Sequence, residues 1–193
     1  MRHTVDKDRL VFLDLETMGL LPTSPIVQVG LVVTRRDGSR MESLDELELV
    51  VPRSEVEWSA AQNVAAAMHA ASGLRQRSID EYESRCRPQG GPPSLHEVSS
   101  QTINFLAAQG FGPGEAVIAG NSVGMDRVWI ATQMPHLHTY LRHRMVDVSA
   151  FRTVDSMFRA PAERPAKAHT AVADCHAAIT EFNEYLTRFA SRT

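Results

Sequence analysis

Two carboxylates, Asp14 and Glu16, are the first residues suited to chemistry, at the end of the apolar run 10–13 and shortly before Gly19. An apolar run bounded by turn residues is typical of a buried strand. Residues i and i+2 of a strand project to the same face, about 7 Å apart at their backbones. Two like charges on a buried strand are costly unless a divalent cation compensates them, because carboxylate oxygens are the ligands that such cations prefer. The pair therefore predicts a metal site, unless the end of the strand simply emerges into solvent.

Two later segments carry further polar residues at comparable places. Asp126 follows a Gly-Asn turn and stands near the start of a helix expected over 127–133. His169 and Asp174 open a helical stretch that runs to about 189, with the histidine at the entrance and the aspartate one turn further along. Taken singly, these residues could be a helix N-terminal aspartate favoured by the helix dipole, a capping histidine and a surface aspartate.

The order and spacing of the three groups are more specific than any one of them. Asp-x-Glu on the first strand, an Asp after a Gly-Asn turn and His-x-Ala-x-x-Asp near the C-terminus resemble the histidine-bearing branch of the DEDD exonuclease superfamily. The resemblance places its five catalytic residues at Asp14, Glu16, Asp126, His169 and Asp174.

Within that superfamily the chain is most similar to the oligoribonucleases, over roughly residues 10–189. Some positions depart from that family's pattern: Thr17-Met18 reverses its usual order, Val64 replaces a tryptophan, and Ala150 replaces a threonine. These departures concern substrate length preference rather than nuclease chemistry. The segments that carry the similarity are 14–20, 69–74, 120–127, 134–135 and 144–149.

The resemblance implies a 3′→5′ exoribonuclease that hydrolyses short single-stranded RNA, dinucleotides included, to 5′-mononucleotides with two metal ions. Asp14, Glu16, Asp126 and Asp174 would hold Mg²⁺ or Mn²⁺, since the set is all oxygen and no cysteine is placed to favour zinc. His169 would take the proton from the attacking water, a role that suits an unperturbed pKa of about 6.5.

Substrate contacts are also implied by the resemblance. Leu20 would wedge between the terminal bases, although a buried turn leucine is the alternative. Ser122, together with Arg144 and Ser149 of a partner subunit in a homodimer, would cap the 5′ phosphate, although Arg144 could form an ordinary surface ion pair. His69 would lie near the scissile bond, with a core or capping role equally open.

Length and composition suit one globular domain, 1–193, with its core at about 10–189. Apolar residues make up 43% of the chain, and no run approaches the roughly 18 residues of a membrane span. The charged segment 1–8 has no apolar signal core, and only two cysteines are present, so a reducing cytoplasm is expected. The net charge of −3 argues against a duplex-coating surface, although residues 127–167 hold seven basic and three acidic side chains.

Periodicity and turn residues predict strands over 10–14, 26–34, 47–51, 116–119 and 145–148, with a hairpin at Asp37-Gly38. Helices are expected over 59–70 and 74–83, from a Ser94–Glu97 capping box, over 151–158 capped by Ser149, and at the C-terminus. Loops are expected over 88–93 and 160–167. The residues alone support only α/β; their order resembles a ribonuclease-H-like exonuclease fold with a mixed five-stranded sheet flanked by helices.

Two other functions compete with this interpretation. A broader exonuclease would act on single-stranded DNA or on structured RNA 3′ ends, and the changes at Val64 and Ala150 favour it. A catalytically silent nucleic-acid-binding module on the same fold is disfavoured by the presence of all five catalytic residues. A serine hydrolase is not expected, since no Gly-x-Ser-x-Gly nucleophile elbow is recognised. No P-loop sequence is present.

Overall fold

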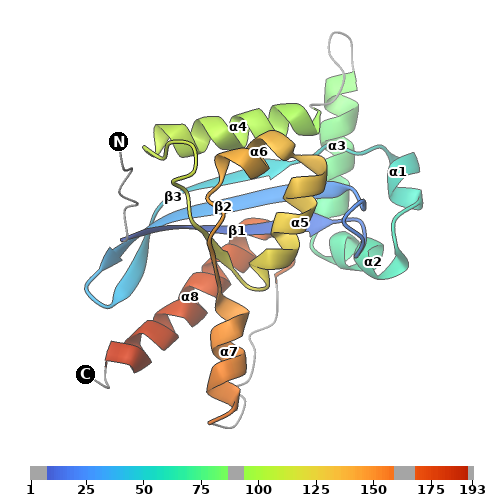
Figure 1. Ribbon diagram of the computed structural model, residues 1–193. Helices are drawn as coiled ribbons and strands as arrows, with labels where there is room; N and C mark the ends of the chain where they lie inside the picture. The colour runs from blue at the N-terminus through green and yellow to red at the C-terminus, as the bar shows by residue number, and fades with distance from the viewer. Residues whose placement is uncertain (1–7, 87–93, 159–167, 191–193) are drawn as a thin grey trace.

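The computed structural model describes residues 8–86, 94–158 and 168–190, so the predicted loops 88–93 and 160–167 lie outside the described residues. A five-stranded sheet with the order β3-β2-β1-β4-β5 runs through the centre (Figure 1). The first three strands pair antiparallel, whereas β1–β4 and β4–β5 pair parallel. The predicted mixed α/β sheet is confirmed. Its strands are β1 (Arg9–Thr17), β2 (Ile26–Asp37), β3 (Arg40–Val50), β4 (Ile118–Gly120) and β5 (Met145–Asp147).

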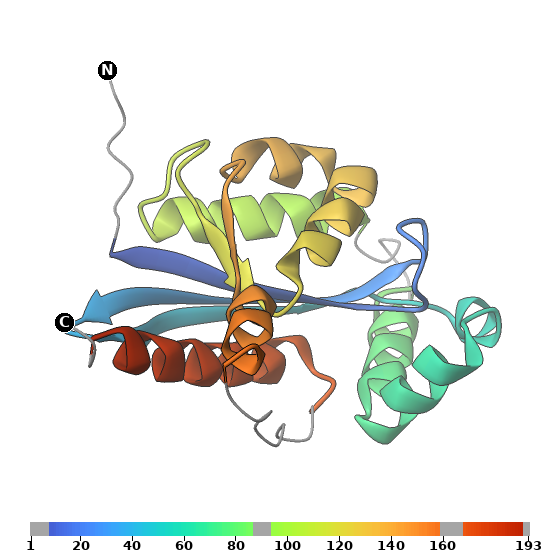
Figure 2. The same ribbon diagram turned by 60° about the horizontal axis from the view of Figure 1, so that its bottom comes forward.

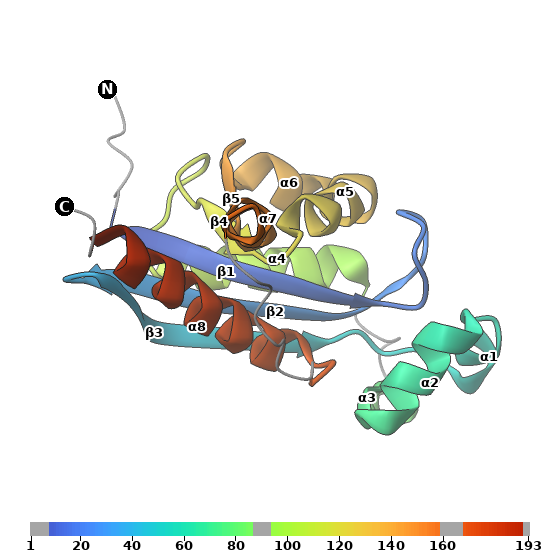
Figure 3. The same ribbon diagram turned by 90° about the horizontal axis from the view of Figure 1, so that it is seen from below.

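Helices cover both faces of this sheet. α8 lies along one face and α4, α5 and α6 lie along the other, as Figures 2 and 3 show. α1, α2 and α3 gather beyond the end of the sheet at which β1 finishes. The helices are α1 (Glu55–Ser59), α2 (Asn63–Ala71), α3 (Leu74–Cys86), α4 (Leu95–Ala108), α5 (Val123–Gln133), α6 (Pro135–Tyr140), α7 (Val148–Ser156) and α8 (Ala171–Ala190).

The side chains of β1 alternate between the two helical layers. Leu13 belongs to the core shared with α4, α5 and α6, whereas Phe12 packs on Phe182 of α8 with ring centroids 5.9 Å apart. Since strand residues two apart share a face, Asp14 and Glu16 project together, as predicted, and their face is the one toward α8.

Strand β2 is buried at every position from 26 to 34, because helices cover both of its faces. Strand β3 begins at Arg40 rather than at 47, and the prediction was too short there. Residues such as Glu42 and Asp45 are exposed at the edge of the sheet. Because this part of the strand is rich in charged residues, it lacks the apolar pattern from which a strand is predicted. The predicted hairpin is confirmed, with Gly38 at φ 57°.

The predicted helices differ from the structure at several points. The expected helix 59–70 is two helices, α1 and α2, and the first begins at a capping box formed by Ser54 and Glu57. Helix α6, which starts at Pro135, was not predicted. Ser149 does not cap the following helix: Asp147 does, because its carboxylate accepts the N–H of Ser149 and α7 starts at Val148. The capping box of Ser94 with Glu97 is confirmed.

Within the described ranges, no helix is long and apolar enough to cross a membrane.

Candidate active site

The end of β1 carries the first two predicted site residues. Glu16 is buried, with 6% of its surface exposed, and Asp14 is partly exposed. Both lie on the face of the sheet that α8 covers. A buried carboxylate needs a cation or hydrogen-bond donors to remain charged at neutral pH.

The start of α8 brings two more site residues to this carboxylate. Asp174 lies in the first turn of α8 and is 6% exposed. His169 stands two residues before the helix in a left-handed conformation, φ 54°, which histidine adopts more readily than most residues. One ligand atom from each of Glu16, His169 and Asp174 lies within 4.8 Å of the other two, so this group could hold a metal ion.

Asp126 reaches the same site from α5, which begins at Val123, four residues before the predicted start at 127. It lies in the first turn of α5, and its Oδ1 accepts a 3.1 Å hydrogen bond from the backbone N–H of Leu15. Leu15 stands between Asp14 and Glu16 in β1. The bond therefore places the Asp126 carboxylate against the stretch of backbone that carries the Asp14 and Glu16 carboxylates.

The charge at the centre of the site acts on Cys175, the residue after Asp174. Cys175 is 1% exposed, and its Sγ lies 3.7 Å from the carbonyl oxygen of Gly30. Burial raises the pKa of the Cys175 thiol well above its ordinary value, and the negative charges of Asp14, Asp126 and Asp174 raise it further. The cysteine is therefore a small apolar filler under a cluster of carboxylates.

His69 lies directly behind Glu16 and is fully buried. Its Nε2 is 2.9 Å from the carbonyl oxygen of Thr17, and its Nδ1 is 3.9 Å from a carboxylate oxygen of Glu16. Burial lowers the pKa of His69, and the nearby charge of His169 lowers it further, against the hydrogen bond to Thr17. A neutral His69 therefore supports the end of β1.

The turn after β1 presents an apolar side chain to solvent. Leu20 is 79% exposed, so the alternative of a buried turn leucine is wrong. Its backbone N–H donates to Oε1 of Gln62, the residue that precedes α2, and Val64 nearby on α2 is 76% exposed. Leu20 and Val64 thus belong to neighbouring exposed segments beside the end of β1.

The predicted phosphate-binding residues separate into a pair and a single residue. Ser122 and Ser149 lie together in the same chain, with their Oγ atoms 3.4 Å apart. Asp147 holds both, because its Oδ1 accepts the N–H of Ser122 at 3.0 Å and the hydroxyl of Ser149 at 2.6 Å. Arg144 is exposed and makes no ion pair with any residue in the described ranges, so the alternative of an ordinary surface ion pair is not supported.

A serine hydrolase was excluded from the sequence because no Gly-x-Ser-x-Gly nucleophile elbow was recognised, and that reason was wrong. Residues 120–124, Gly-Asn-Ser-Val-Gly, also fit the nucleophile elbow of serine hydrolases, and Ser122 has φ 56° between β4 and α5. That chemistry requires a histidine that accepts the proton of the hydroxyl. The Ser122 hydroxyl donates instead to Ser149, which argues against a serine nucleophile.

Comparison with known proteins agrees with this geometry. An oligoribonuclease of Streptomyces griseus is 33% identical over 184 residues, which cover 92% of this chain and 85% of that protein. The chain belongs to the oligoribonuclease family. This confirms the predicted family and the assignment to the 3′–5′ exoribonucleases. An oligoribonuclease of Rhodococcus jostii is 32% identical over 185 residues, 93% of this chain and 86% of that protein. No protein-family model matches.

The fold of this oligoribonuclease family member is also similar to that of solved nucleases. The crystal structure of cell-death related nuclease 4 superposes with a TM-score of 0.57 over 94% of this chain. Sequence identity is 13%, and this chain spans 64% of the length of that protein, so the likeness concerns the fold alone. It confirms the ribonuclease-H-like exonuclease architecture.

Proposed function

We propose that this protein is a metal-dependent 3′→5′ exoribonuclease that degrades short single-stranded RNA, dinucleotides included, to 5′-mononucleotides. The observation that carries the proposal is the convergence of Glu16, His169 and Asp174, whose ligand atoms lie within 4.8 Å of one another. Asp14 stands two residues before Glu16, and Asp126 is bonded to the peptide between them.

The donor set suits hard divalent cations, because carboxylate oxygens dominate it. Asp14, Glu16 and Asp174 would hold Mg²⁺ or Mn²⁺, with Asp126 acting directly or through bound water. A pair of such ions, when bound, activates water and neutralises the charge that develops on the phosphate and the leaving oxygen.

Histidine is the residue type best suited to exchange a proton near neutral pH, and His169 is the one histidine of this set. We assign it the role of general base, which takes the proton of the attacking water. Its position next to two carboxylates supports this role, because their charges stabilise the imidazolium that forms.

The substrate would lie between two exposed features of the chain. Leu20 would stack on the terminal bases, since an exposed apolar side chain beside the metal site offers a face to them. Ser122 and Ser149 would bind the 5′ phosphate together with Arg144, whose planar guanidinium can bond two phosphate oxygens. Because Ser149 lies beside Ser122 of its own chain, only Arg144 need come from the partner of a homodimer.

A broader exonuclease remains the second candidate, and Val64 favours it. This side chain is exposed at the start of α2, where a tryptophan would give a larger stacking surface for a short substrate. Turnover of a 5′-labelled RNA dinucleotide, compared with that of an RNA and a DNA of about twenty nucleotides, separates the two candidates. Each substrate is tested with Mn²⁺ and with excess chelator. Faster turnover of the dinucleotide supports our proposal, whereas preference for the long strands or full activity in chelator contradicts it.

A further inference from the structure

Gln28, the third residue of β2, is a fully buried polar residue that the proposed mechanism does not use. Both ends of its amide are hydrogen-bonded. Oε1 accepts a 2.9 Å bond from the backbone N–H of Ala171, and Nε2 donates a 2.5 Å bond to Oε1 of Glu48. A buried amide is tolerated when its hydrogen bonds are made, so both contacts hold the side chain in one orientation.

The Glu48 contact decides which end of the amide faces α8. A carboxylate can only accept, so it selects the NH₂ group of Gln28 and leaves the amide oxygen for Ala171. Glu48 is itself held by Arg77 of α3 at 3.4 Å. The Glu48–Arg77 ion pair therefore holds the NH₂ end of the Gln28 amide, and this orients the amide oxygen toward α8.

The strand register places Gln28 opposite a site residue. Glu16 pairs with Gln28 across the β1–β2 ladder, and Asp14 pairs with Gly30. Gly30 also serves α8: a Cβ added there would lie 2.6 Å from the backbone carbon of Ala171, so only glycine lets the helix approach this closely. The two β2 residues that pair with Asp14 and Glu16, Gly30 and Gln28, are thus also the ones that contact the start of α8.

Ala171 is the first residue of α8, two residues after His169 and three before Asp174. The first N–H groups of a helix have no partner within the helix, and Gln28 supplies one from the sheet. We propose that Gln28 is a positioning residue: it fixes the N-terminus of α8 so that His169 and Asp174 meet Glu16 at the metal site. This inference rests on the proposed function.

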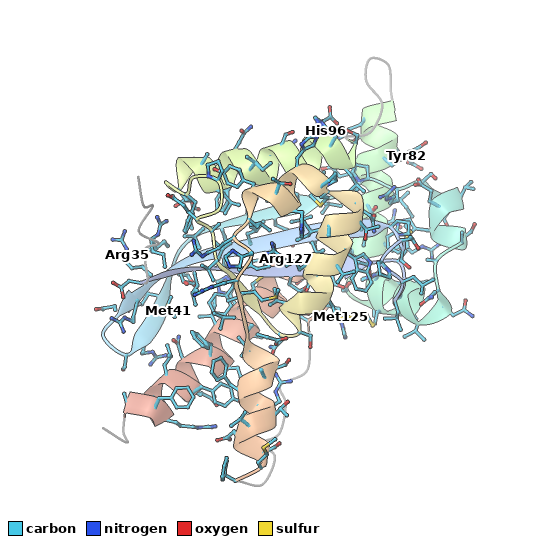
Figure 4. All side chains as sticks on the ribbon, viewed as in Figure 1. Arg35, Met41, Tyr82, His96, Met125 and Arg127 are labelled. Atoms are coloured by element: carbon cyan, nitrogen blue, oxygen red, sulfur yellow. The ribbon has the colours of Figure 1, made fainter. Side chains whose placement is uncertain are left out.

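The matched control is Asn183, which makes a similar contact further along the same helix. Asn183 is 7% exposed, accepts the N–H of Met41 at 2.6 Å and donates to its carbonyl oxygen at 2.9 Å. It lies twelve residues after Ala171, about 18 Å along α8. Met41 lies near the β2–β3 hairpin, away from the end of the sheet that carries the site (Figure 4).

The test compares Gln28→Met, which keeps the volume and removes both hydrogen bonds, with Asn183→Leu. The melting temperature Tm is measured with and without Mn²⁺, and kcat and KM are measured on the dinucleotide. Both variants should lower Tm in the absence of metal. Only Gln28→Met should shrink the rise in Tm caused by Mn²⁺ and lower kcat by about tenfold or more, with little change in KM, because misplaced groups weaken metal binding and catalysis.

A donor–acceptor exchange gives a second, independent readout. Gln28→Glu alone sets two carboxylates against each other and should reduce the Mn²⁺-induced rise in Tm. Adding Glu48→Gln restores a donor opposite an acceptor, and the double variant should recover most of that rise.

Wild-type kcat and metal response in folded Gln28→Met would overturn the positioning role, as would equal losses in Asn183→Leu or no recovery in the double variant. If the wild type hydrolyses no oligonucleotide, the proposed function fails. The Mn²⁺-induced change in Tm still tests Gln28 in that case.

Discussion

The backbone N–H of Leu15 donates a 3.1 Å hydrogen bond to Oδ1 of Asp126, a residue 111 positions further along the chain. Strand β1 pairs with β4 only at Val11 and Phe12, and the N–H of Val11 donates to the carbonyl oxygen of Val117. The N–H of Leu15, four residues further along β1, points to the same edge of the strand, but lies beyond the residues that pair with β4. The Asp126 carboxylate supplies the acceptor that a strand would otherwise provide there, so it contributes both to the fold and to the proposed metal site.

This double role predicts different effects for two substitutions of Asp126. Asp126→Asn keeps an oxygen that can accept from Leu15 and should leave the free energy of unfolding nearly unchanged, whereas Asp126→Ala should lower it by about 1–3 kcal/mol. Both should lose most of their activity, because both remove the charge. Denaturant unfolding and dinucleotide turnover measure the two effects. Equal stability of the variants would contradict the structural role of the bond.

His169→Ala should lower kcat by about 10²–10⁴-fold, the usual loss when a general base is removed. The rise in Tm caused by Mn²⁺ should persist, because Glu16 and Asp174 remain. His176→Ala on the exposed side of α8 is the control, since its ring contacts Glu46 rather than the site. If His169→Ala instead binds Mn²⁺ poorly and regains normal turnover at saturating metal, His169 is a ligand and not the base.

Local patterns sufficed for much of the fold. The apolar run of β1, the Asp37-Gly38 hairpin and the Ser94 capping box each depend on neighbours in sequence, and all three are confirmed. Edge strand β3 was partly missed because its pairing with β2 across the hairpin overrides a charged sequence. The cap of α7 was misplaced because the sequence offers two candidates, and only the backbone geometry selects Asp147 over Ser149.

In the candidate site, too, some features could be predicted from the sequence, whereas others depend on tertiary packing. Residue types and order predicted that Glu16, His169 and Asp174 act together, and the structure brings them within 4.8 Å of one another. The contacts of Gln28 were not predicted, because they depend on which strands and helices pack together, whereas a core position of His69 was one of the alternatives left open. A polar residue in an apolar strand, such as Gln28 in 26–33, was the one signal that could have drawn attention to it.

Leu20→Ala should weaken binding of a short RNA by about 1–3 kcal/mol, or about 5–150-fold, which is the usual value of one base stacked on a side chain. Leu21→Ala is the matched control, because Leu21 is the next residue and is also exposed, at 62%. Binding of a dinucleotide to metal-free protein, measured by fluorescence anisotropy, separates this effect from catalysis. Equal losses for both variants would indicate a general apolar contact rather than a wedge at Leu20.

Acid should weaken the contact of α7 and α8 through Glu181. Burial alone would raise the pKa of Glu181, but hydrogen bonds from Arg152, Asn121 and Tyr185 outweigh it and lower the pKa below 4.5. A lowered pKa in the folded state contributes stability above the unfolded value of about 4.5, and this is lost as the pH falls further.

Glu181→Gln should therefore have a lower Tm than the wild type at pH 7, and the difference should shrink as the pH falls below 4.5. Thermal unfolding followed by circular dichroism over this range measures it. A difference in Tm that is independent of pH would assign the effect of the substitution to packing.

Arg144→Ala tests the proposed completion of the site by a partner subunit. The substitution should weaken binding of 5′-phosphorylated dinucleotides by about 10–150-fold, since a charge-assisted bidentate contact is worth roughly 1.5–3 kcal/mol. Unphosphorylated dinucleotides should be affected much less. Arg35→Ala is the control, because Arg35 is also an exposed arginine but lies far along β2 from the site (Figure 4).

Mixing Arg144→Ala with Asp14→Asn decides whether Arg144 acts on its own chain or on the partner. Each variant alone should be weakly active on the phosphorylated substrate. In a mixed dimer with two-fold geometry, one site combines the intact carboxylates of one chain with Arg144 of the other, so activity should return to at most about half of the wild-type value for that species. No recovery despite demonstrated subunit exchange, or a monomer in sedimentation, would mean that Arg144 does not act across a dimer. The phosphate would then be held by Ser122 and Ser149 of one chain, and the broader exonuclease would become the better description, because a substrate held at one end only has no fixed length.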